Sequence, residues 1–442
     1  MKRIRIAFLS ILAVLTALGF IADVPLWRGL EFFAVRSSAV DLTGVLGMGV
    51  MSIGMMLALR PILLEPWLGG LDKIYRLHKW LGITGLVISV VHWLWAQGPK
   101  WAVGWGWLAR PARRAPVEPA SAWEAFARSQ RGLAEAIGEW AFYALVVVVV
   151  LALIKRFPYR HFFKTHRLLA VVYLFLVFHS VVLTKSAYWT SALGPVMAIL
   201  MAGGTAAAFM SLFRRVGHRR RAVGVIEKLE YHQANRVLAV TVQLLDRWSG
   251  HKAGQFAFLT FDRDEGPHPF TISSAWRGDG RVSFHIKETG DYTRTLPGRL
   301  RIGALATVEG PYGCFDFNTC KPRQIWVAGG IGITPFLARL QDLAGSENRQ
   351  VIDFFFSTNA PDTGFLERVR QLSERAGVRL HALVTRKDGY LDAARLSDAV
   401  PEWKDADVWF CGPAGFGKSL RRDLSARGLD EGDFHQELFS MR

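Results

Sequence analysis

The chain has 442 residues, of which 51% are apolar, and it carries a formal net charge of +17. Apolar residues crowd into the part before residue 213, at a density unusual for a soluble protein. The basic residues lie beside these apolar runs, so the charge indicates the positive-inside pattern of membrane proteins rather than nucleic-acid binding. Only three cysteines occur, with no C-x-x-C or calcium-loop pattern, which argues against a disulfide scaffold and indicates neither a zinc nor a calcium site.

Six apolar runs are long enough to cross a membrane as helices. The first follows Lys2, Arg3 and Arg5 and has no small-residue cleavage site after it, so we expect a membrane span rather than a signal peptide. The pair Gly203-Gly204 in the last run predicts a kink or a close contact between helices. The runs are Ile4–Ile21, Leu42–Leu59, Tyr75–Gln97, Ala134–Ile154, His166–Leu183 and Ala192–Phe213.

Basic clusters at Lys2–Arg5, Lys155–Arg167 and Arg214–Arg221 fall on one side of the membrane if all six runs span it. The positive-inside rule makes that side the cytoplasm and places the rest of the chain there. We therefore expect a multi-pass protein of a cell membrane, with its remaining domains in the cytoplasm. The loop 98–133 lies opposite and is also basic, against the rule, and its tryptophans indicate that part of it lies in the membrane interface.

Two of the apolar runs carry histidines near both ends. His78 and His92 are fourteen residues apart, which is about 21 Å along a helix and about 1400° of rotation, so both rings leave nearly the same face. His166 and His179 are thirteen residues apart, and about 1300° of rotation leaves them about 140° out of line on an ideal helix. The second pair therefore requires a bulge or a local rewinding of its helix.

Four histidines at two matching depths predict two stacked haems, one held by His78 and His166 and the other by His92 and His179. Ionisable groups are costly inside a membrane and are usually functional there, although a single histidine in an apolar helix is more often a hydrogen-bonded core residue. His161 aligns better with His179 by angle, but eighteen residues span about 27 Å, too long to match the other helix.

From about Arg221 the pattern changes to short strands separated by Gly, Asn and Asp turns, which predicts a small antiparallel β-barrel. After Lys321 strands alternate with helices, which predicts a doubly wound, parallel α/β sheet. We expect a six-helix membrane domain over 1–216, the barrel over 217–320 and the α/β domain over 321–442. The strands are predicted at Val223–Leu229, Val237–Leu244, Gln255–Phe261, Phe270–Ser274, Val282–Lys287, Gln324–Ala328, Val351–Phe356, Arg379–Val384 and Val408–Cys411, and the helices at Thr334–Leu343, Leu366–Ala376 and Gly415–Ala426.

The stretch 325–336 reads as a buried strand, a glycine turn and the start of a helix. Thr334 is the predicted cap of that helix, and Pro335 suits its first turn. Gly329, Gly330 and Gly332 would let a pyrophosphate approach the exposed N–H groups of the helix. Cys411-Gly412-Pro413 follows another apolar strand, so the two turns predict one dinucleotide site, the alternative being two ordinary turns.

The stretch from His268 to Ser274 resembles the flavin signature of the NADPH oxidase and ferric reductase branch of the ferredoxin–NADP reductase superfamily. It consists of His268, Pro269, Phe270, Thr271, Ile272, Ser273 and Ser274. In that family this strand lies along the isoalloxazine ring of FAD. Residues 286–293 resemble the segment that approaches the flavin pyrophosphate, and residues 309–313 resemble the turn that closes the flavin domain. The resemblance implies cofactor contacts from His285, Lys287, Gly290 and Thr293, and catalytic roles for Cys411 at the nicotinamide and Phe439 over the flavin.

The resemblance extends to the membrane half. Family members carry paired histidines on their third and fifth helices, at spacings of thirteen or fourteen residues, which implies two b-type haems at the four histidines. Animal superoxide-producing members have a further histidine one turn beyond the outer ligand, where this chain has Ala96. The candidate counterpart of their oxygen-site arginine, near the start of the second helix, is Arg36.

The choice between NADPH and NADH depends on the residues that follow two strands of the α/β domain, Ser357-Thr-Asn359 and Thr385-Arg386-Lys387. Arg386 could form a two-pronged contact with a 2′-phosphate, and Lys387 adds charge beside it. Surface charge after a strand is equally ordinary. We expect NADPH, with NADH as the alternative.

Together these features predict an enzyme that passes electrons from cytosolic NADPH through FAD and two haems to an acceptor across the membrane. The acceptor is dioxygen, giving superoxide, or a ferric chelate, and no obligatory protein partner is indicated. Arg76, Lys79 and Arg167 are candidate partners of haem propionates or, alternatively, ordinary membrane-flank charges. Two other classes stay open: a nucleotide-regulated transporter or proton channel with a histidine relay, and a flavin reductase anchored by inert helices.

Overall fold

The computed structural model describes residues 1–23, 31–110, 118–119, 121–154, 156–262, 264–345, 350–360 and 362–437. The described chain forms two compact units. The first consists of Met1–Leu68 and Lys73–Val216, and the second of Gly69–Asp72 and the chain from Gly217 onward. Each unit is considered by itself.

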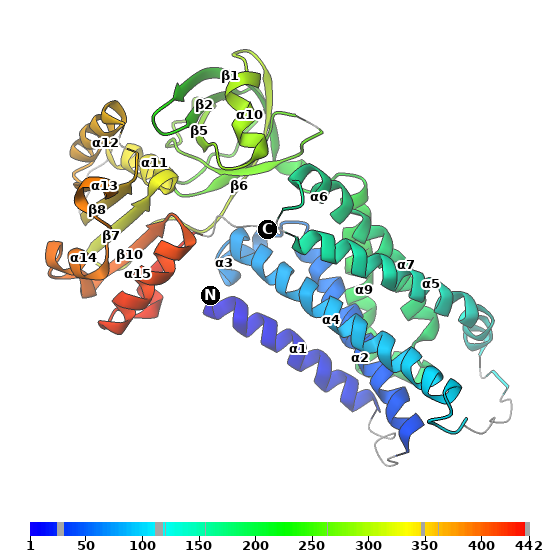
Figure 1. Ribbon diagram of the computed structural model, residues 1–442. Coiled ribbons are helices and arrows are strands. Elements are labelled where there is room, and N and C mark those ends of the chain that lie inside the picture. Colours follow the sequence, from blue (N-terminus) through cyan, green and yellow to red (C-terminus); the bar gives the residue numbers. More distant parts are fainter. Residues whose placement is uncertain are drawn as a thin grey trace. The chain divides into compact units, whose positions relative to one another are not determined.

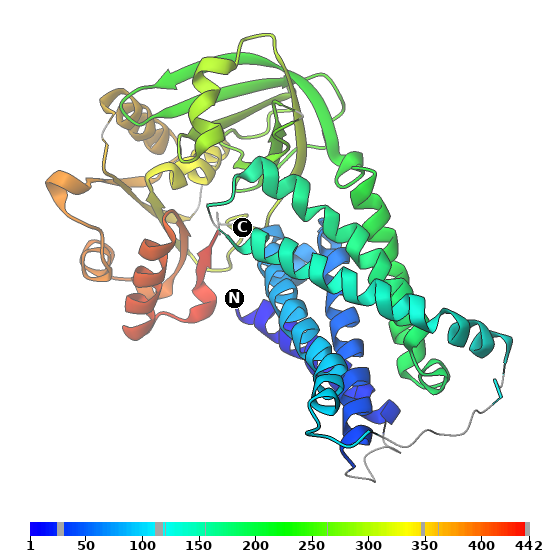
Figure 2. The same cartoon turned by 45° about the vertical axis from the view of Figure 1, so that its right-hand side comes forward.

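Six helical segments among the described residues are long and apolar enough to cross a membrane, which confirms the predicted six spans. They run alongside one another in both views (Figure 1, Figure 2). Shorter helices, η2 (Ile62–Leu64), α3 (Glu65–Leu68) and α8 (Ser186–Trp189), lie between them. The six segments are α1 (Lys2–Asp23), α2 (Phe32–Leu57), α4 (Leu71–Gly104), α5 (Ala122–Leu153), α6 (Tyr159–His166) followed by α7 (Leu168–Leu183), and α9 (Leu193–Leu212).

The fifth span is interrupted at Arg167, between α6 and α7. Arg167 keeps right-handed helical angles, but its N–H bonds the carbonyl of Thr165 rather than that of Phe163. Such a tightened turn changes the rotation per residue locally. The irregularity that the spacing of His166 and His179 required is therefore present, directly after the first of them.

A closed antiparallel barrel begins the second unit. Its strand order is β4-β3-β6-β1-β2-β5, and a bridge between Ile272 and Phe284 joins the two ends. Leu238, Val240 and Val242 alternate into its core along one strand, as a barrel with one solvated face requires. The elements are η3 (His218–Arg220), β1 (Arg221–His232), β2 (Val237–Leu244), β3 (Phe256–Thr260), β4 (His268–Thr271), β5 (Arg281–Lys287), α10 (Asp291–Arg299) and β6 (Leu305–Tyr312).

A five-stranded parallel sheet follows, in the order β11-β10-β7-β8-β9. Trp326 and Ala328 of the central strand face one apolar cluster, while Ile325 and Val327 face another, so both faces of the sheet are covered, as predicted. The strands are β7 (Arg323–Gly329), β8 (Val351–Thr358), β9 (Arg379–Val384), β10 (Ala406–Cys411) and β11 (Phe434–Gln436). The helices are η4 (Gly330–Ile333), α11 (Thr334–Leu343), α12 (Thr363–Arg375), α13 (Thr385–Asp388), α14 (Ala393–Ala399), η5 (Trp403–Asp405), α15 (Ala414–Ala426) and η6 (Glu431–Asp433).

The glycine pair in α9 marks a close helix contact. A Cβ on Gly204 would lie 2.1 Å from the hydroxyl of Tyr173 on α7 and 3.1 Å from the backbone of Ser52 on α2. The hydroxyls of Tyr173 and Ser52 are themselves hydrogen-bonded at 2.7 Å, and both residues are buried. Three helices therefore meet where α9 has no side chain.

Replacing Gly204 by alanine is therefore expected to destabilise the membrane unit by about 1–3 kcal/mol, because the backbone and the bonded tyrosine leave the methyl no room. Gly203→Ala is the matched control, since its Cβ would meet only the end of the flexible Met56 side chain. Thermal unfolding of the detergent-solubilised protein, followed by size-exclusion chromatography, measures the difference. Equal losses in both variants would contradict the contact.

Candidate functional site

The structure brings the four predicted histidines together in two ring pairs within the membrane unit. The ring centroids of His78 and His166 are 5.9 Å apart, with 74° between the ring planes. Those of His92 and His179 are 6.3 Å apart, with 82° between the planes. The pairs connect the third span to the fifth at two positions, one at each end of the stretch from His78 to His92.

Hydrogen bonds from neighbouring helices orient three of the four rings. The Nδ1 atoms of His78 and His92 lie 2.9 Å and 3.1 Å from the carbonyl oxygens of Gly54 and Val40 on α2. His179 Nδ1 lies 2.8 Å from the carbonyl oxygen of Ala134 on α5. A carbonyl oxygen only accepts, so Nδ1 carries the proton in each ring and Nε2 keeps its lone pair, which is the tautomer that ligates a metal.

The outer pair has further contacts. The hydroxyl of Thr43 lies 3.0 Å from His92 Nδ1. Gly138 on α5 makes room for the other ring, because a Cβ there would lie 2.1 Å from His179 Nδ1. Neither residue carried a signal in the sequence, since each acts through a neighbour far away in the chain.

The ring pairs fit haem ligation. Two metal–nitrogen bonds of about 2 Å each, plus the radii of two imidazole rings, separate ring centres by about 6 Å. No group of three or more His, Cys, Asp or Glu side chains gathers as a metal site among the described residues. Paired histidines suit a haem because the porphyrin supplies the other four ligands. His78, His166, His92 and His179 would be the residues that hold two haems.

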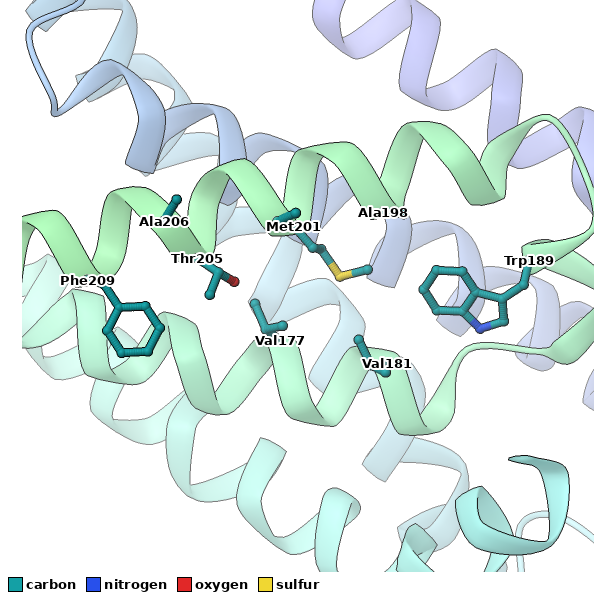
Figure 3. A pocket seen from close by; sticks show the side chains of 9 residues that line it. Val177, Val181, Trp189, Ala198, Met201, Thr205, Ala206 and Phe209 are labelled. Atoms are coloured by element: carbon teal, nitrogen blue, oxygen red, sulfur yellow. The ribbon is translucent and has the colours of Figure 1, made fainter. Parts of the chain in front are cut away.

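A cavity of about 510 Å³ in the membrane unit lies elsewhere, between α7 and α9 (Figure 3). Its lining is apolar apart from the hydroxyl of Thr205 and the indole N–H of Trp189. None of the four histidines lines it. It therefore has no part in the predicted metal sites.

The predicted flavin strand forms the edge of the barrel as β4. The ring of His268 stacks on Tyr292, with centroids 4.4 Å apart and planes 18° apart. Burial lowers the pKa of His268 to about 4, so the ring is neutral near pH 7, and burial also raises the pKa of Tyr292. The hydroxyls of Thr271 and Tyr292 are buried and have no hydrogen-bond partner among the described residues. Buried polar atoms of this kind fit a bound polar cofactor such as FAD.

The rest of the predicted flavin strand is engaged in the barrel itself. Ile272 lies in the core and Phe270 packs against it, so these two offer a cofactor mainly backbone groups. Ser273 bonds His285 at 2.8 Å, and the hydroxyl of Ser274 accepts from the N–H of Ser283 at 3.0 Å. Burial, with the nearby His232 and Arg368 charges, lowers the pKa of His285 to about 4. Pro269 lies between His268 and Phe270 on β4 and is partly buried.

The segment predicted to approach a pyrophosphate forms the start of α10. The hydroxyl of Thr293 accepts from the N–H groups of Gly290 and Thr289, each at 3.0 Å, and so caps the helix. Lys287 ends β5, and its ammonium lies near the glycine turn, 3.9 Å from where a Cβ of Gly330 would be. Lys287 forms no ion pair with a described residue. Its free positive charge fits an anionic ligand at this turn.

The two glycine turns meet at the carboxyl ends of β7 and β10. A Cβ on Gly332 would lie 2.2 Å from the carbonyl oxygen of Cys411, and one on Gly329 would lie 2.7 Å from Pro413. Gly412 is also close to the other turn, because its Cβ would lie 3.0 Å from the backbone of Gly329. The chain leaves β7 towards β8 on one side and returns to β10 on the other, so the turns lie at a topological switch point, where open α/β sheets bind nucleotides.

One prediction about this turn is wrong. Thr334 does not cap α11: it is the first residue of the helix, and its hydroxyl donates to the carbonyl of Ile331 at 3.2 Å. The short helix η4 leads directly into α11, so the chain never has the extended residue that a side-chain cap needs. Pro335 lies in the first turn, as predicted.

Cys411 and the predicted specificity residues lie at the carboxyl edge of the same sheet. Cys411 is fully buried, and its sulfur lies 3.7 Å from a carboxylate oxygen of Glu437. Phe439 is outside the described residues. Arg386 and Lys387 are exposed on α13, and the preceding Thr385 bonds Ser357 at 3.4 Å, so the ends of β8 and β9 meet where a 2′-phosphate was expected. Sequence reasoning did not single out Glu437 or Tyr292, although Tyr292 lies in the segment 286–293 that it had identified.

Comparisons with known proteins give a family match in each of the two units. Residues 43–177 match the family described as ferric reductase like transmembrane component, and residues 224–315 match an FAD-binding domain. Over 188 residues the chain is 27% identical to the glycine betaine monooxygenase reductase subunit of Chromohalobacter salexigens, covering 39% of this chain and 48% of that protein. It is also 27% identical over 182 residues to an NADPH oxidoreductase of Mycobacterium tuberculosis, covering 39% and 47%. The chain spans about half the length of the curated relatives it matches.

Among solved structures, the flavohemoglobin of Malassezia yamatoensis with bound FAD and heme has a TM-score of 0.47 at 18% identity, covering 95% of this chain and 99% of that one. A ferredoxin NADP+ reductase of Neisseria gonorrhoeae with bound FAD and NADP has a TM-score of 0.42 at 18% identity, covering 49% and 98%. The two family matches, one in each compact unit, show a ferric reductase-like transmembrane component joined to an FAD-binding dehydrogenase domain. The chain is therefore a multi-pass membrane protein with the parts of an NAD(P)H-dependent oxidoreductase.

Proposed function

We propose that the protein is a transmembrane oxidoreductase that passes electrons from cytosolic NADPH to an acceptor on the other side of a bacterial inner membrane. When bound, FAD accepts a hydride from NADPH and releases single electrons, and two b-type haems carry these across the membrane. The observation that carries the proposal is the two histidine ring pairs, 5.9 Å and 6.3 Å apart, with Nδ1 already bonded in three of the rings.

Residues of the second unit supply the contacts that NADPH and FAD would need on the cytosolic side. The glycines at the switch point leave space for a pyrophosphate, and Lys287 offers it positive charge. Arg386 and Lys387 would bind the 2′-phosphate that distinguishes NADPH from NADH. Thr271 and Tyr292 have buried hydroxyls that would bond the flavin, and the neutral ring of His268 stacks on the tyrosine ring and holds it in place. The basic clusters between spans support the cytoplasmic placement of these sites.

The two histidine pairs weigh against the other two classes of function. A proton relay needs rings that can exchange protons along a path, whereas here Nδ1 of three rings is bonded to a helix carbonyl. Inert anchoring helices would not place four rings in two facing pairs. Arg76, Lys79 and Arg167 form no ion pair among the described residues, which suits the proposed contacts with haem propionates.

For the acceptor we propose dioxygen, with superoxide as product, on the strength of Arg36. Pro99 lies inside α4 and has no N–H to bond the carbonyl of Trp95. Arg36 satisfies that carbonyl through Nε at 3.2 Å, and Nη2 bonds the carbonyl of Ala96 at 3.0 Å. A fixed guanidinium therefore lies one helical turn beyond His92, beside the alanine, and it forms no ion pair among the described residues. Its charge would stabilise a superoxide anion as it forms.

A ferric chelate is the second candidate acceptor. The loop that follows α4 is basic, and Arg110 is exposed in it, which would attract an anionic chelate. Arg113 and Arg114, which belong to the same predicted patch, lie outside the described residues. Anaerobic ferric-citrate reduction that weakens with added salt, and when these three arginines become serine, would favour this acceptor.

The haem assignment predicts that Gly138→Ala removes the outer haem selectively, because the new methyl would occupy the place of the His179 ring. Pyridine haemochrome quantitation should fall from about two haems per chain to about one. Gly132→Ala is the control on the same helix, since a Cβ there meets nothing within 4 Å. NADPH-driven reduction of soluble dyes should persist in both variants. Full haem content in Gly138→Ala would refute the assignment of His179.

The flavin assignment predicts that Thr271→Val lowers FAD affinity about five- to tenfold, the loss expected for one buried hydrogen bond. Thr271→Ser keeps a hydroxyl and should restore most of the affinity. Dithionite should still reduce the haems of both variants, whereas NADPH should reduce them in proportion to bound flavin. Unchanged FAD binding in the valine variant would place the flavin elsewhere.

The acceptor assignment predicts that Arg36→Leu slows superoxide formation about tenfold, through the loss of a charge-assisted contact, while anaerobic haem reduction by NADPH stays unchanged. Arg36→Lys keeps the charge and should lose less. Superoxide is measured as the cytochrome c reduction that superoxide dismutase suppresses. A superoxide rate that ignores the loss of Arg36 would remove the argument for an oxygen site and leave the chelate as the better candidate.

A further inference from the structure

Four tryptophans form an unbroken series of ring contacts that begins beside the outer histidine pair. Trp93 follows His92 directly in the sequence. Ring centroids are 5.3 Å apart between Trp93 and Trp101, 6.5 Å between Trp101 and Trp105, and 4.9 Å between Trp105 and Trp107. Exposure increases along the series, to 40% at Trp101, 62% at Trp105 and 75% at Trp107. The series therefore joins the neighbourhood of His92 to the surface.

The backbone at the end of α4 builds the exposed pair. Gly106 has a φ of +77°, and the N–H of Trp107 bonds the carbonyl of Ala102 at 2.8 Å while that of Gly106 bonds Val103 at 3.1 Å. These two bonds with a left-handed glycine are a Schellman motif, which ends the helix and turns the chain back. The turn brings the ring of Trp107 against that of Trp105 at an angle of 60°.

The inner end of the series is held by packing. Trp93 stacks on Phe142 of α5, with centroids 5.3 Å apart and planes 17° apart. It also contacts Tyr143 edge-on, at 6.3 Å. Its ring is thus fixed between two spans, next to the helix turn that carries His92. Electronic coupling decays much less with distance through rings in contact than through the same distance of water.

Exposed tryptophans also anchor membrane proteins at the interface, and such an anchor is the alternative explanation for this series. Trp123, at the start of α5, is 42% exposed and contacts Phe126 at 5.7 Å, and it has no ring contact with the series among the described residues. An anchor needs only such a ring at the surface. It needs neither a continuous series leading inward nor a helix end that pairs two indoles.

We propose that Trp105 and Trp107 form the docking site of a second electron acceptor, a planar aromatic molecule of the quinone class, and that Trp101 and Trp93 couple it to the outer haem. Exposed indole faces favour stacking with another flat π-system. Exposed Lys100 and Arg110, close in sequence, would favour an acceptor that becomes an anion. The inference depends on the proposed function for its supply of electrons.

The transfer is balanced without any change in the tryptophans. With a haem held by His92 and His179, one electron would reduce the quinone to its radical anion, and a second would give the dianion, which would take two protons from the water outside to become the hydroquinone. NADPH is the reductant for both electrons. The indoles are neither oxidised nor reduced, and they contribute only stacking and coupling.

Binding can be measured without turnover. Menadione is titrated into the purified protein in nanodiscs, in the absence of NADPH, and saturable quenching of tryptophan fluorescence is recorded. Trp105→Leu and Trp107→Leu should weaken the apparent affinity about fivefold, the scale of one aromatic stacking contact. Trp123→Leu should leave the affinity unchanged. An equal effect of all three substitutions would reveal a general membrane effect and overturn the proposal.

Kinetics then separate docking from coupling. Under anaerobic conditions NADPH-driven menadione reduction should show a raised KM in Trp105→Leu and Trp107→Leu, and a lowered kcat with unchanged KM in Trp93→Leu. The menadione reduction rate of His92→Leu, which lacks a ligand of the outer haem, is subtracted to remove direct reduction by the flavin. Superoxide formation should stay within about twofold of the unsubstituted protein in the three tryptophan variants.

Two results distinguish a failure here from a failure of the proposed function. Menadione reduction that passes through His92 but ignores Trp93, Trp105 and Trp107 would overturn the docking site and leave the transmembrane reductase intact. Loss of haem reduction by NADPH in the unsubstituted, flavin-loaded protein would overturn the proposed function, and this inference with it.

Discussion

The hydrogen bonds between imidazole Nδ1 atoms and helix carbonyls are the interaction on which the membrane unit depends. A polar group inside an apolar bundle is costly unless it has a partner, and a helix carbonyl can accept a second bond through its free lone pair. His78 and His92 are thereby tied to α2, and His179 to α5. Each bond holds two helices together and leaves Nε2 with its lone pair.

Close backbone approach has a similar role in both units. Gly138 admits the ring of His179, Gly204 admits the hydroxyl of Tyr173, and Gly332 lies against the carbonyl of Cys411. In each place a single methyl group would occupy space that a functional or bonded group already fills. The sites are therefore positioned as much by absent side chains as by present ones, which makes them sensitive to substitutions that preserve helix propensity.

The dehydrogenase unit obtains its site from topology. Closing the barrel with the bridge from Ile272 to Phe284 buries the end of the flavin strand, so that Thr271 is left with a hydroxyl inside the protein and no partner among the described residues. The reversal of strand order around β7 brings Gly329 against Gly412, although 83 residues separate them in the sequence. The proposed cofactor sites follow from these two closures.

The sequence by itself determined those features of the protein that a local pattern of residues can encode. Apolar runs and period-two alternation predicted the six spans, the barrel and the parallel sheet, because burial on one face leaves a periodic signal and burial all round leaves a continuous apolar run. It did not predict β6, where Glu309, Gly310 and Pro311 interrupt the alternation, or the three-residue β11, which forms only by pairing with β10. It wrongly predicted a cap at Thr334, because nothing in the glycine turn indicated that the short helix η4 would lead directly into α11. The roles of Thr43, Gly138 and the carbonyl of Ala134 were decided by tertiary structure alone, since a backbone oxygen or a missing Cβ acquires its partner only when distant helices pack.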